Sequence, residues 1–292
     1  MGRAFSPLRY PGGKAKLSAF LANALEANDF DDPIYVEPYA GGAGAALTLL
    51  FSERVQSILV NDADPRIYAF WKAITEYADK FIELLQNVKL DVEEWYIQRQ
   101  IYLEPEMHDH LSLGFATFFL NRTSRSGIIH NSGPIGGYKQ NGAYKIDARF
   151  NRADLVKRIR HVSMYADRID VQNLDGLALL ESLRQPNGYA QEQYFLYLDP
   201  PYYIKGGELY LNQFSPDQHG ALAQYLERPY PHKWIMTYDN VEEIAHLYES
   251  QNQITFDLAY SAYERRKGKE ILIYPDGVVV PDETEQLLRR AS

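Results

Sequence analysis

Two parts of the chain alternate between short apolar runs and amphipathic stretches, and a differently patterned segment lies between them. The apolar runs are bounded by Gly, Pro, Asn or Asp, as buried strands are, and the stretches that follow them have the 3.6-residue period of helices. This alternation predicts a parallel α/β core. The expected strands are 33–38, 57–60, 169–171, 194–198, 233–237, 254–260 and 270–274, and the expected helices are 45–51, 65–74, 174–183, 218–226 and 241–248.

The intervening segment has two patterns of its own. Residues 75–120 are helical in period and rich in aromatic side chains, whereas residues 121–150 are rich in Gly, Asn, Ser and Arg and have little periodicity. A chain of 292 residues exceeds a typical single domain, so a core with an inserted module is expected. We therefore predict a core of residues 1–74 and 161–292, split around a mainly helical insert of residues 75–160.

Composition narrows the class of protein. Hydrophobic residues make up 46% of the chain and charged residues 24%, which is typical of a packed globular protein. No apolar run approaches the roughly 20 residues that a membrane span needs, and the N-terminal sequence lacks the apolar segment of a signal peptide. These features predict a soluble, cytoplasmic protein with no membrane partner.

The absence of cysteine removes several kinds of chemistry. Disulfides, thiolate nucleophiles and cysteine-based metal sites are excluded, and so is the methylation of cytosine C5 through a cysteine adduct. His108 and His110 flank Asp109, but this polar helical stretch has no further ligand nearby. We therefore expect no metal site.

Charge is distributed unevenly along the chain. The net charge is −9, which is unfavourable for binding a polyanion, but residues 121–160 hold nine Lys or Arg against two Asp, a net charge of +7. A solvated helix face explains part of the group Lys157, Arg158 and Arg160. The remaining basic residues of this segment predict a surface for nucleic acid.

Asp199-Pro200-Pro201-Tyr202 directly follows the apolar run 194–198, and so lies where parallel α/β sheets place their ligands. Two successive prolines restrict the backbone and have no N–H to donate. The Asp199 carboxylate and the Pro200 carbonyl can therefore accept both hydrogen bonds of an exocyclic amine, orienting its lone pair toward a methyl donor. Tyr202 can stack on the base. The alternative is a Pro-Pro turn that ends a strand beside an exposed Asp.

Four further parts of the chain have features of a nucleotide-cofactor site. The glycine turn 37–44 allows a ligand to approach the backbone closely. Asp62, about 20 residues later, can accept hydrogen bonds from ribose hydroxyls, and Asp175 can accept one from an adenine amine. Capping of the following helix is the alternative for each aspartate. The segment 7–14 lacks the P-loop pattern, and Lys14 suits a carboxylate-bearing ligand.

Several motifs, in their order along the chain, carry a family resemblance. PLRYPGGK (7–14), VEPYAGGAGAAL (36–47), NDAD (61–64), NR (121–122) and DPPYY (199–203) closely resemble the Dam-like, D12 class of DNA adenine-N6 methyltransferases. The resemblance implies a Rossmann-like S-adenosylmethionine-dependent methyltransferase fold with an inserted, mainly helical DNA-recognition domain. It also implies direct methyl transfer to N6 of a flipped adenine in double-stranded DNA, with S-adenosylhomocysteine as product, in a bacterial or phage-encoded enzyme.

The site residues implied by the resemblance fall into three groups. The catalytic residues are Asp199, Pro200, Pro201 and Tyr202. The cofactor-binding residues are Tyr10, Gly12, Gly13, Lys14, Glu37, Pro38, Tyr39, Gly41, Gly42, Asp62, Asp175 and Asp199. The DNA-binding residues are Arg9, Asn121, Arg122, Arg125, Tyr138, Lys139 and Lys145.

The chain departs from the family pattern in the glycine turn and in the insert. Tyr39 replaces the usual Phe, and Ala43 stands where the last Gly of the turn is expected. The insert differs from that of GATC-specific members, so that specificity is not carried over.

Asp rather than Ser at 199 favours adenine as the target base. Cytosine-N4 methylation and a non-catalytic DNA-binding protein of the same fold are the alternatives, and a cognate restriction endonuclease is a possible partner.

Overall fold

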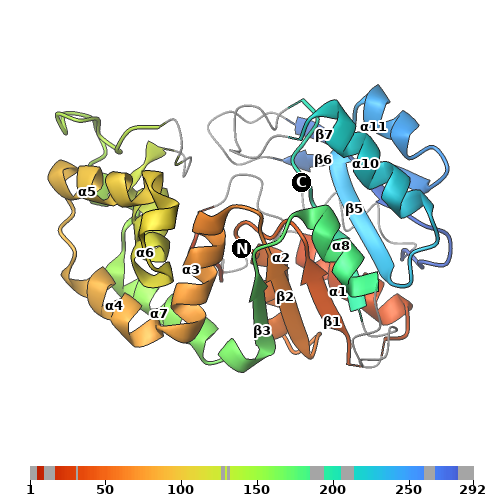
Figure 1. The fold of residues 1–292 in the computed structure, drawn as a ribbon, viewed down its shortest axis with the longest axis horizontal. Coiled ribbons are helices and arrows are strands. Elements are labelled where there is room, and N and C mark those ends of the chain that lie inside the picture. The colour runs from red at the N-terminus through yellow and green to blue at the C-terminus, as the bar shows by residue number, and fades with distance from the viewer. Residues whose placement is uncertain are drawn as a thin grey trace.

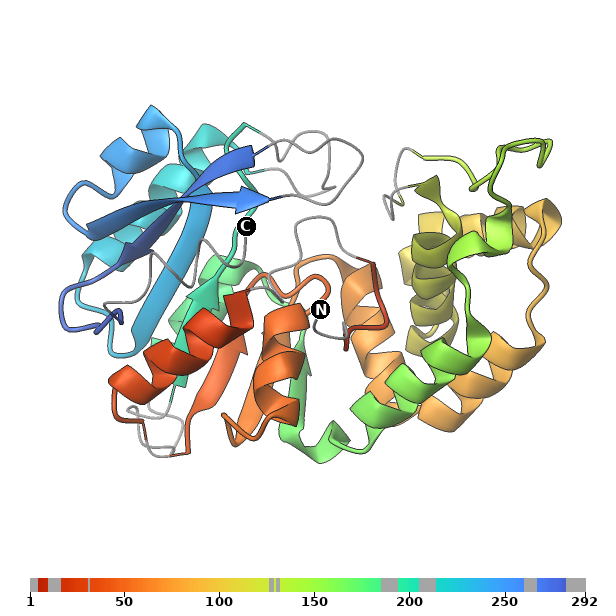
Figure 2. The same cartoon turned by 180° about the vertical axis from the view of Figure 1, so that it is seen from behind.

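The computed structural model describes residues 5–9, 17–30, 32–125, 129, 132–184, 194–204, 214–259 and 267–281. It has a body built around one sheet and a group of helices beside the β3 edge of that sheet (Figure 1). The same two parts are seen from behind in Figure 2.

The sheet has seven strands in the order β3-β2-β1-β4-β5-β7-β6. β7 is antiparallel to both of its neighbours, and the other described pairings are parallel. The first five strands thus follow the order 3-2-1-4-5 of the Rossmann arrangement. The strands are β1 Ile34–Glu37, β2 Ser57–Asn61, β3 Ile169–Gln172, β4 Tyr194–Leu198, β5 Lys233–Asp239, β6 Asn252–Ala259 and β7 Lys267–Tyr274.

Helices cover both faces of the sheet, because side chains along each central strand alternate between two buried cores. Phe195 and Tyr197 of β4 join one core, whereas Leu196 and Leu198 join the other. Figure 1 shows α8 and α10 in front of the sheet, and Figure 2 shows α1 and α2 in front of the opposite face. The helices of this part are α1 Ser18–Ala27, α2 Gly44–Phe51, α3 Pro65–Glu76, α8 Gly176–Arg184, α10 Pro216–Glu227 and α11 Glu242–Leu247.

The helical group packs around α6, whose residues from Leu113 to Thr123 are all buried. A helix that is apolar on every side needs neighbours on every side, and α3, α4 and α5 supply them. Aromatic rings fill the centre, with Phe81 edge-on to both Phe115 and Phe118. The helices of this group are α4 Ala78–Asn87, α5 Val92–Leu103, α6 His110–Thr123 and α7 Arg152–Ser163, with short 3₁₀ turns at Pro105–Met107, Ile146–Arg149 and Ala166–Arg168.

The predicted strands and helices of the α/β core are confirmed, with shifts of a few residues at their ends. Tyr260, at the end of one expected strand, lies outside the described residues. Helix α1 was not predicted, because no side chain caps its first turn and no acidic residue marks its start. Among the described residues, none of the helices is long and apolar enough to cross a membrane.

Candidate active site

The carboxyl ends of β1 to β5 meet along one edge of the sheet, because these five strands are parallel. The loops that leave this edge carry the described residues of the predicted catalytic and cofactor sites. They are Glu37–Gly44 after β1, Asp62–Asp64 after β2, Asn173–Asp175 after β3 and Asp199–Tyr202 after β4.

Asn61, at the end of β2, joins three of these loops. Its Nδ2 donates hydrogen bonds to the carbonyl oxygens of Pro38 (2.8 Å) and Leu174 (3.0 Å), and its Oδ1 accepts one from the Leu174 N–H (2.8 Å). The side chain is fully buried, so each of these bonds replaces one that water would make. The motifs did not predict this role of Asn61, although a polar residue at the end of a buried strand is a signal for it.

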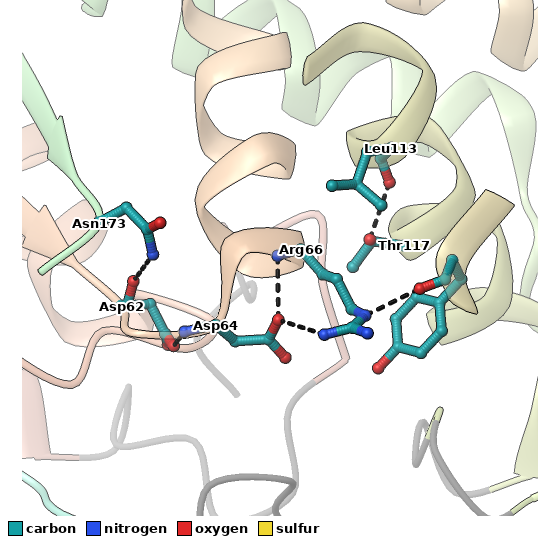
Figure 3. A network of polar contacts seen from close by, with 7 residues as sticks. Asp62, Asp64, Arg66, Leu113, Thr117 and Asn173 are labelled. Carbon is teal, nitrogen blue, oxygen red and sulfur yellow. Dashed lines mark hydrogen bonds and ion pairs between the residues drawn. The ribbon is translucent and has the colours of Figure 1, made fainter. Parts of the chain in front are cut away.

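Asp62 accepts two backbone hydrogen bonds. Its Oδ2 accepts one from the Gly41 N–H and its Oδ1 one from the Asp64 N–H, both at 2.9 Å. Burial raises the pKa of Asp62 to about 7. Figure 3 shows Asn173 reaching the same turn, where its Nδ2 donates to the Asp62 carbonyl at 2.7 Å.

Asp64, and not Asp62, caps the helix that follows. Asp64 Oδ1 accepts from the Arg66 N–H at 2.9 Å, and Pro65 occupies the first helical position of α3. The Arg66 guanidinium also bonds Asp64 Oδ1 and donates from Nε to the Tyr102 carbonyl at 2.8 Å (Figure 3). The capping alternative considered for Asp62 is therefore wrong, and its carboxylate is held beside the glycine turn instead.

Asp175 does cap a helix. Its Oδ1 accepts from the Leu177 N–H at 2.9 Å and from the Ala178 N–H at 3.4 Å, in the first turn of α8. The predicted alternative, in which Asp175 caps the following helix, is thus confirmed for Oδ1. A contact of its carboxylate with cofactor stays a prediction.

The glycine turn after β1 follows a left-handed path at two positions. Gly41 has φ 46°, and its carbonyl accepts a hydrogen bond from Trp71 Nε1 at 2.9 Å. Ala43 has φ 44° and ψ 37°, a conformation that costs an alanine about 1 kcal/mol relative to glycine. Ala43 therefore preserves the turn where the family has glycine. The Tyr39 ring fills the space beside Gly176, where an added Cβ would lie 2.4 Å from the ring.

Glu37, at the end of β1, is almost completely buried. Its Oε1 accepts hydrogen bonds from the Tyr35 hydroxyl (3.1 Å) and from the Ala46 N–H in the first turn of α2 (3.0 Å). Burial outweighs these two bonds and raises the pKa of Glu37 to about 8. Glu37 is therefore protonated over much of the range in which most carboxyl groups are charged.

Replacement of Glu37 by Gln should weaken the pH dependence of stability. The folded protein holds the Glu37 proton up to about pH 8, whereas a glutamate of ordinary pKa 4.5 has lost it in the unfolded chain. Unfolding then releases a proton between these values, so this stabilisation is full below pH 4.5 and is lost as pH rises through 8. Urea unfolding at pH 5, 6.5 and 8 should show Glu37→Gln gaining stability relative to wild type with rising pH. Parallel curves for the two proteins would contradict the assignment.

The Asp199 carboxylate is held from the neighbouring strand. Thr237 Oγ1 on β5 donates to Asp199 Oδ1 at 3.1 Å, and the same hydroxyl lies 2.6 Å from the hydroxyl of Tyr197. Thr237 and Tyr197 are buried, and Asp199 is partly exposed. The carboxylate is thus oriented by a buried side chain of β5 and remains partly exposed, and its role in catalysis stays a prediction. No motif in the sequence predicted this role of Thr237.

The residues after Pro201 are anchored by two buried carboxylates, whose roles no motif in the sequence predicted. The Tyr202 hydroxyl donates to Glu270 Oε1 on β7 at 2.6 Å. The N–H groups of Tyr203 and Ile204 donate to Oδ1 and Oδ2 of Asp239, each at 3.0 Å. Pro200 is buried and Pro201 partly buried, which completes a rigid support for this segment.

Asn121 and Arg122, predicted to contact DNA, instead lie in the interior. Asn121 Oδ1 accepts from the Arg9 N–H and Asn121 Nδ2 donates to the Arg9 carbonyl, both at 2.7 Å. The Arg122 guanidinium donates from Nε (2.7 Å) and from a terminal nitrogen to the Pro7 carbonyl. Burial, followed by the charges of neighbouring arginines, lowers the pKa of Arg122 to about 9. These bonds give Asn121 and Arg122 a structural role, in which they hold residues 7–9, and their predicted contact with DNA stays a prediction.

The other predicted DNA contacts have different surroundings. Arg9 is half-buried, and its guanidinium donates to the Ser124 carbonyl at 3.5 Å. Arg125, Tyr138, Lys139 and Lys145 are exposed. The Tyr138 ring stacks on Tyr96 with centroids 5.9 Å apart. The predicted cofactor residues Tyr10, Gly12, Gly13 and Lys14 lie outside the described residues.

The polar stretch around Asp109 has a structural explanation. Asp109 Oδ1 accepts from the Ser112 N–H at 2.7 Å and so caps α6. In the described part of the chain, no group of three His, Cys, Asp or Glu side chains could hold a metal ion.

Comparison with known proteins decides the family. A family model described as D12 class N6 adenine-specific DNA methyltransferase matches residues 10–262. The chain belongs to this family. It is therefore an S-adenosylmethionine-dependent DNA adenine-N6 methyltransferase with a Rossmann-like fold, as the motifs predicted. No curated protein sequence matches this D12 methyltransferase.

Solved structures of two other methyltransferases resemble it distantly. The rRNA methyltransferase AviRa from Streptomyces viridochromogenes is 12% identical, with a TM-score of 0.40, over 92% of this chain and 88% of that one. A human methyltransferase 10 domain containing protein is 10% identical, with a TM-score of 0.38, over 89% and 82% of the two chains.

Two substitutions in the D12 methyltransferase should separate structural from DNA-contacting residues. Asn121→Ala removes two buried hydrogen bonds to the Arg9 backbone and should lower the free energy of unfolding by about 1–3 kcal/mol. Arg125→Ala removes an exposed cation and should leave stability within about 0.5 kcal/mol, while weakening DNA binding and reducing its salt dependence. Urea unfolding and fluorescence anisotropy at two salt concentrations measure both. Equal stability of Asn121→Ala and wild type would contradict the structural role.

Proposed function

We propose that this methyltransferase is sequence-specific and transfers the methyl group directly to N6 of an adenine that is flipped out of double-stranded DNA. One observation carries the proposal. The Asp199 carboxylate is oriented by Thr237 at the same sheet edge where Asp62 is held against the glycine turn. An acceptor for a target amine, after β4, and an acceptor for a nucleoside cofactor, after β2, thus lie at the carboxyl ends of the two parallel strands that flank β1.

The described residues fit S-adenosylmethionine, whose sulfonium supplies the methyl carbon. Each Asp62 oxygen accepts one hydrogen bond from the described backbone, and a carboxylate oxygen can accept two, so both ribose hydroxyls can bind there. The left-handed glycine turn keeps side chains away from this position. We propose the cofactor-binding set named by the motifs, with Asp62 on the ribose and Lys14 on the carboxylate.

At the target base, Asp199 and Pro200 act through their oxygens. The two N–H bonds of the adenine amine donate to the Asp199 carboxylate and the Pro200 carbonyl, which orients the nitrogen lone pair in line with the methyl carbon. The carboxylate would also stabilise the positive charge that develops on nitrogen as the N–C bond forms and the bond between sulfur and the methyl carbon breaks. N6 would then lose one proton to the Asp199 carboxylate or to water, and S-adenosylhomocysteine would leave. Tyr202 stacks on the base. No residue of the chain becomes covalently modified in this reaction.

We propose that residues 75–160 select the DNA sequence and that residues 1–74 and 161–292 carry out the chemistry. The helical group and the sheet share one buried core, so the two parts have a fixed junction. The exposed side chains Arg125, Tyr138, Lys139 and Lys145 provide cations for phosphates and a ring for stacking. They come from the segment whose net charge opposes that of the whole chain.

Expression in a host that lacks DNA methylation tests this function. Nucleoside analysis of the host DNA should show N6-methyladenine, and sequencing of the modified bases should place it in one short recognition sequence. N4-methylcytosine instead would support the alternative target, whose amine fits the same two acceptors. Unmodified DNA from a host that contains folded protein would support the non-catalytic alternative. A restriction endonuclease that cuts the same sequence would identify the proposed partner.

A further inference from the structure

Two buried carboxylates lie side by side beneath the catalytic segment. Asp239 of β5 and Glu270 of β7 are direct partners in the antiparallel register, and both are almost completely buried. Side chains directly opposite each other project from the same face of a sheet, with Cβ atoms about 5 Å apart. A pair of like charges in this arrangement is unfavourable unless hydrogen bonds compensate it.

The catalytic segment supplies that compensation. Glu270 accepts from the Tyr202 hydroxyl at 2.6 Å, the length of a strong bond to a carboxylate. Asp239 accepts from two successive backbone N–H groups, those of Tyr203 and Ile204. The three donors are consecutive along the chain and directly follow Pro201, so both carboxylates point toward one short stretch.

The same face of the sheet also supports Asp199. Thr237 is two residues before Asp239 on β5 and therefore lies on the same face. It donates to Asp199, while Glu270 accepts from Tyr202. The first and last residues of the DPPY segment are thus each fixed by a buried side chain from β5 or β7.

We propose that Glu270 is a positioning residue for methyl transfer, which fixes the ring of Tyr202 in the orientation on which the flipped adenine stacks. This inference rests on the proposed function, because it assigns the base to the Tyr202 ring. Asp239 fixes the backbone that follows. The ring is then oriented before the base arrives, so less ordering remains to be done when the base enters.

This role affects the chemical step more than DNA affinity. Phosphate contacts on the exposed basic residues dominate affinity and do not involve Glu270. A freely turning Tyr202 ring leaves the adenine amine misaligned with the Asp199 and Pro200 oxygens. Loss of the anchor should therefore lower kcat and leave KM for DNA nearly unchanged.

A double-mutant cycle tests the inference. Tyr202→Phe keeps the ring and removes the donor, and should lower the single-turnover rate by about tenfold or more. Glu270→Gln keeps the shape and a neutral acceptor, and should lower the rate by about three- to tenfold. If Glu270 acts through the Tyr202 hydroxyl, then Glu270→Gln should have no further effect in the Tyr202→Phe protein. Fluorescence of 2-aminopurine at the target position should show a changed base environment in both single variants.

The controls distinguish the possible failures. Asp170→Asn, an exposed carboxylate on β3, should keep wild-type activity, and thermal unfolding should show that every variant is folded. Multiplying effects in the double variant would overturn the inference, as would a wild-type rate in either single variant. If wild type itself methylates no DNA, the proposed function fails instead.

Discussion

Asp199→Ala should lower the rate of methyl transfer by about 10²- to 10⁴-fold. A hydrogen bond to a charged acceptor contributes about 1.5–3 kcal/mol, which is roughly 10- to 150-fold in rate. Asp199 also orients the amine, and the loss of alignment adds a further factor. Its carboxylate is held by Thr237, so in wild type this orientation exists before substrate binds. Transfer of tritiated methyl groups to DNA that contains the recognition sequence measures the effect.

Two comparisons make this result specific to the carboxylate. Asp199→Asn keeps one oxygen acceptor and the same volume, and should retain more activity than Asp199→Ala. Thr237→Val removes the donor to Asp199 and should cause a smaller loss, because the carboxylate remains but turns more freely. Wild-type transfer by Asp199→Ala, with DNA binding intact, would remove Asp199 from the proposed mechanism.

The sequence predicted those strands and helices whose position follows from neighbouring residues, such as an apolar run or a helix-start signal. The run 194–198 predicted β4 within its observed bounds because the strand is buried on both faces and so has few polar residues. Pro65 and the acidic residues before it marked the start of α3. By contrast, α1 lacks such signals, since its N-cap residue is Leu17, whose side chain cannot accept a hydrogen bond from the N–H groups of the first turn.

Roles that depend on distant segments were not predictable. Asn121 and Arg122 begin the basic segment 121–160, and the family resemblance implies that they contact DNA. Their partners are residues 7–9, more than 100 positions earlier in the chain. Glu270 and Asp239 are likewise brought under Tyr202 by the pairing of β5 with β7, for which no local signal exists. A polar side chain is expected at the surface unless its hydrogen-bond partner in the folded protein is known, and that partner can lie far away in the sequence.

The junction between the sheet and the helical group depends on one glycine. Gly114 of α6 lies against α3, where an added Cβ would be 2.4 Å from the Ala69 carbonyl oxygen and 2.8 Å from the Phe70 Cα. Both atoms belong to the backbone, so a rotamer change cannot relieve the overlap and the two helices must separate. α3 begins directly after Asp62–Asp64, so its displacement would also disturb the loop in which we propose that Asp62 binds the cofactor.

Gly114→Ala should therefore destabilise the protein by about 3 kcal/mol, the upper end of the usual range for overpacking. Gly220→Ala is the matched control, because Gly220 also lies within a helix but an added Cβ there meets no atom within 4 Å. That substitution should raise stability by about 0.5–1 kcal/mol through helix propensity. Urea unfolding of the three proteins measures both changes. Equal stability of the two variants would show that α3 and α6 can separate at little cost, and that the junction is looser than their backbone contact implies.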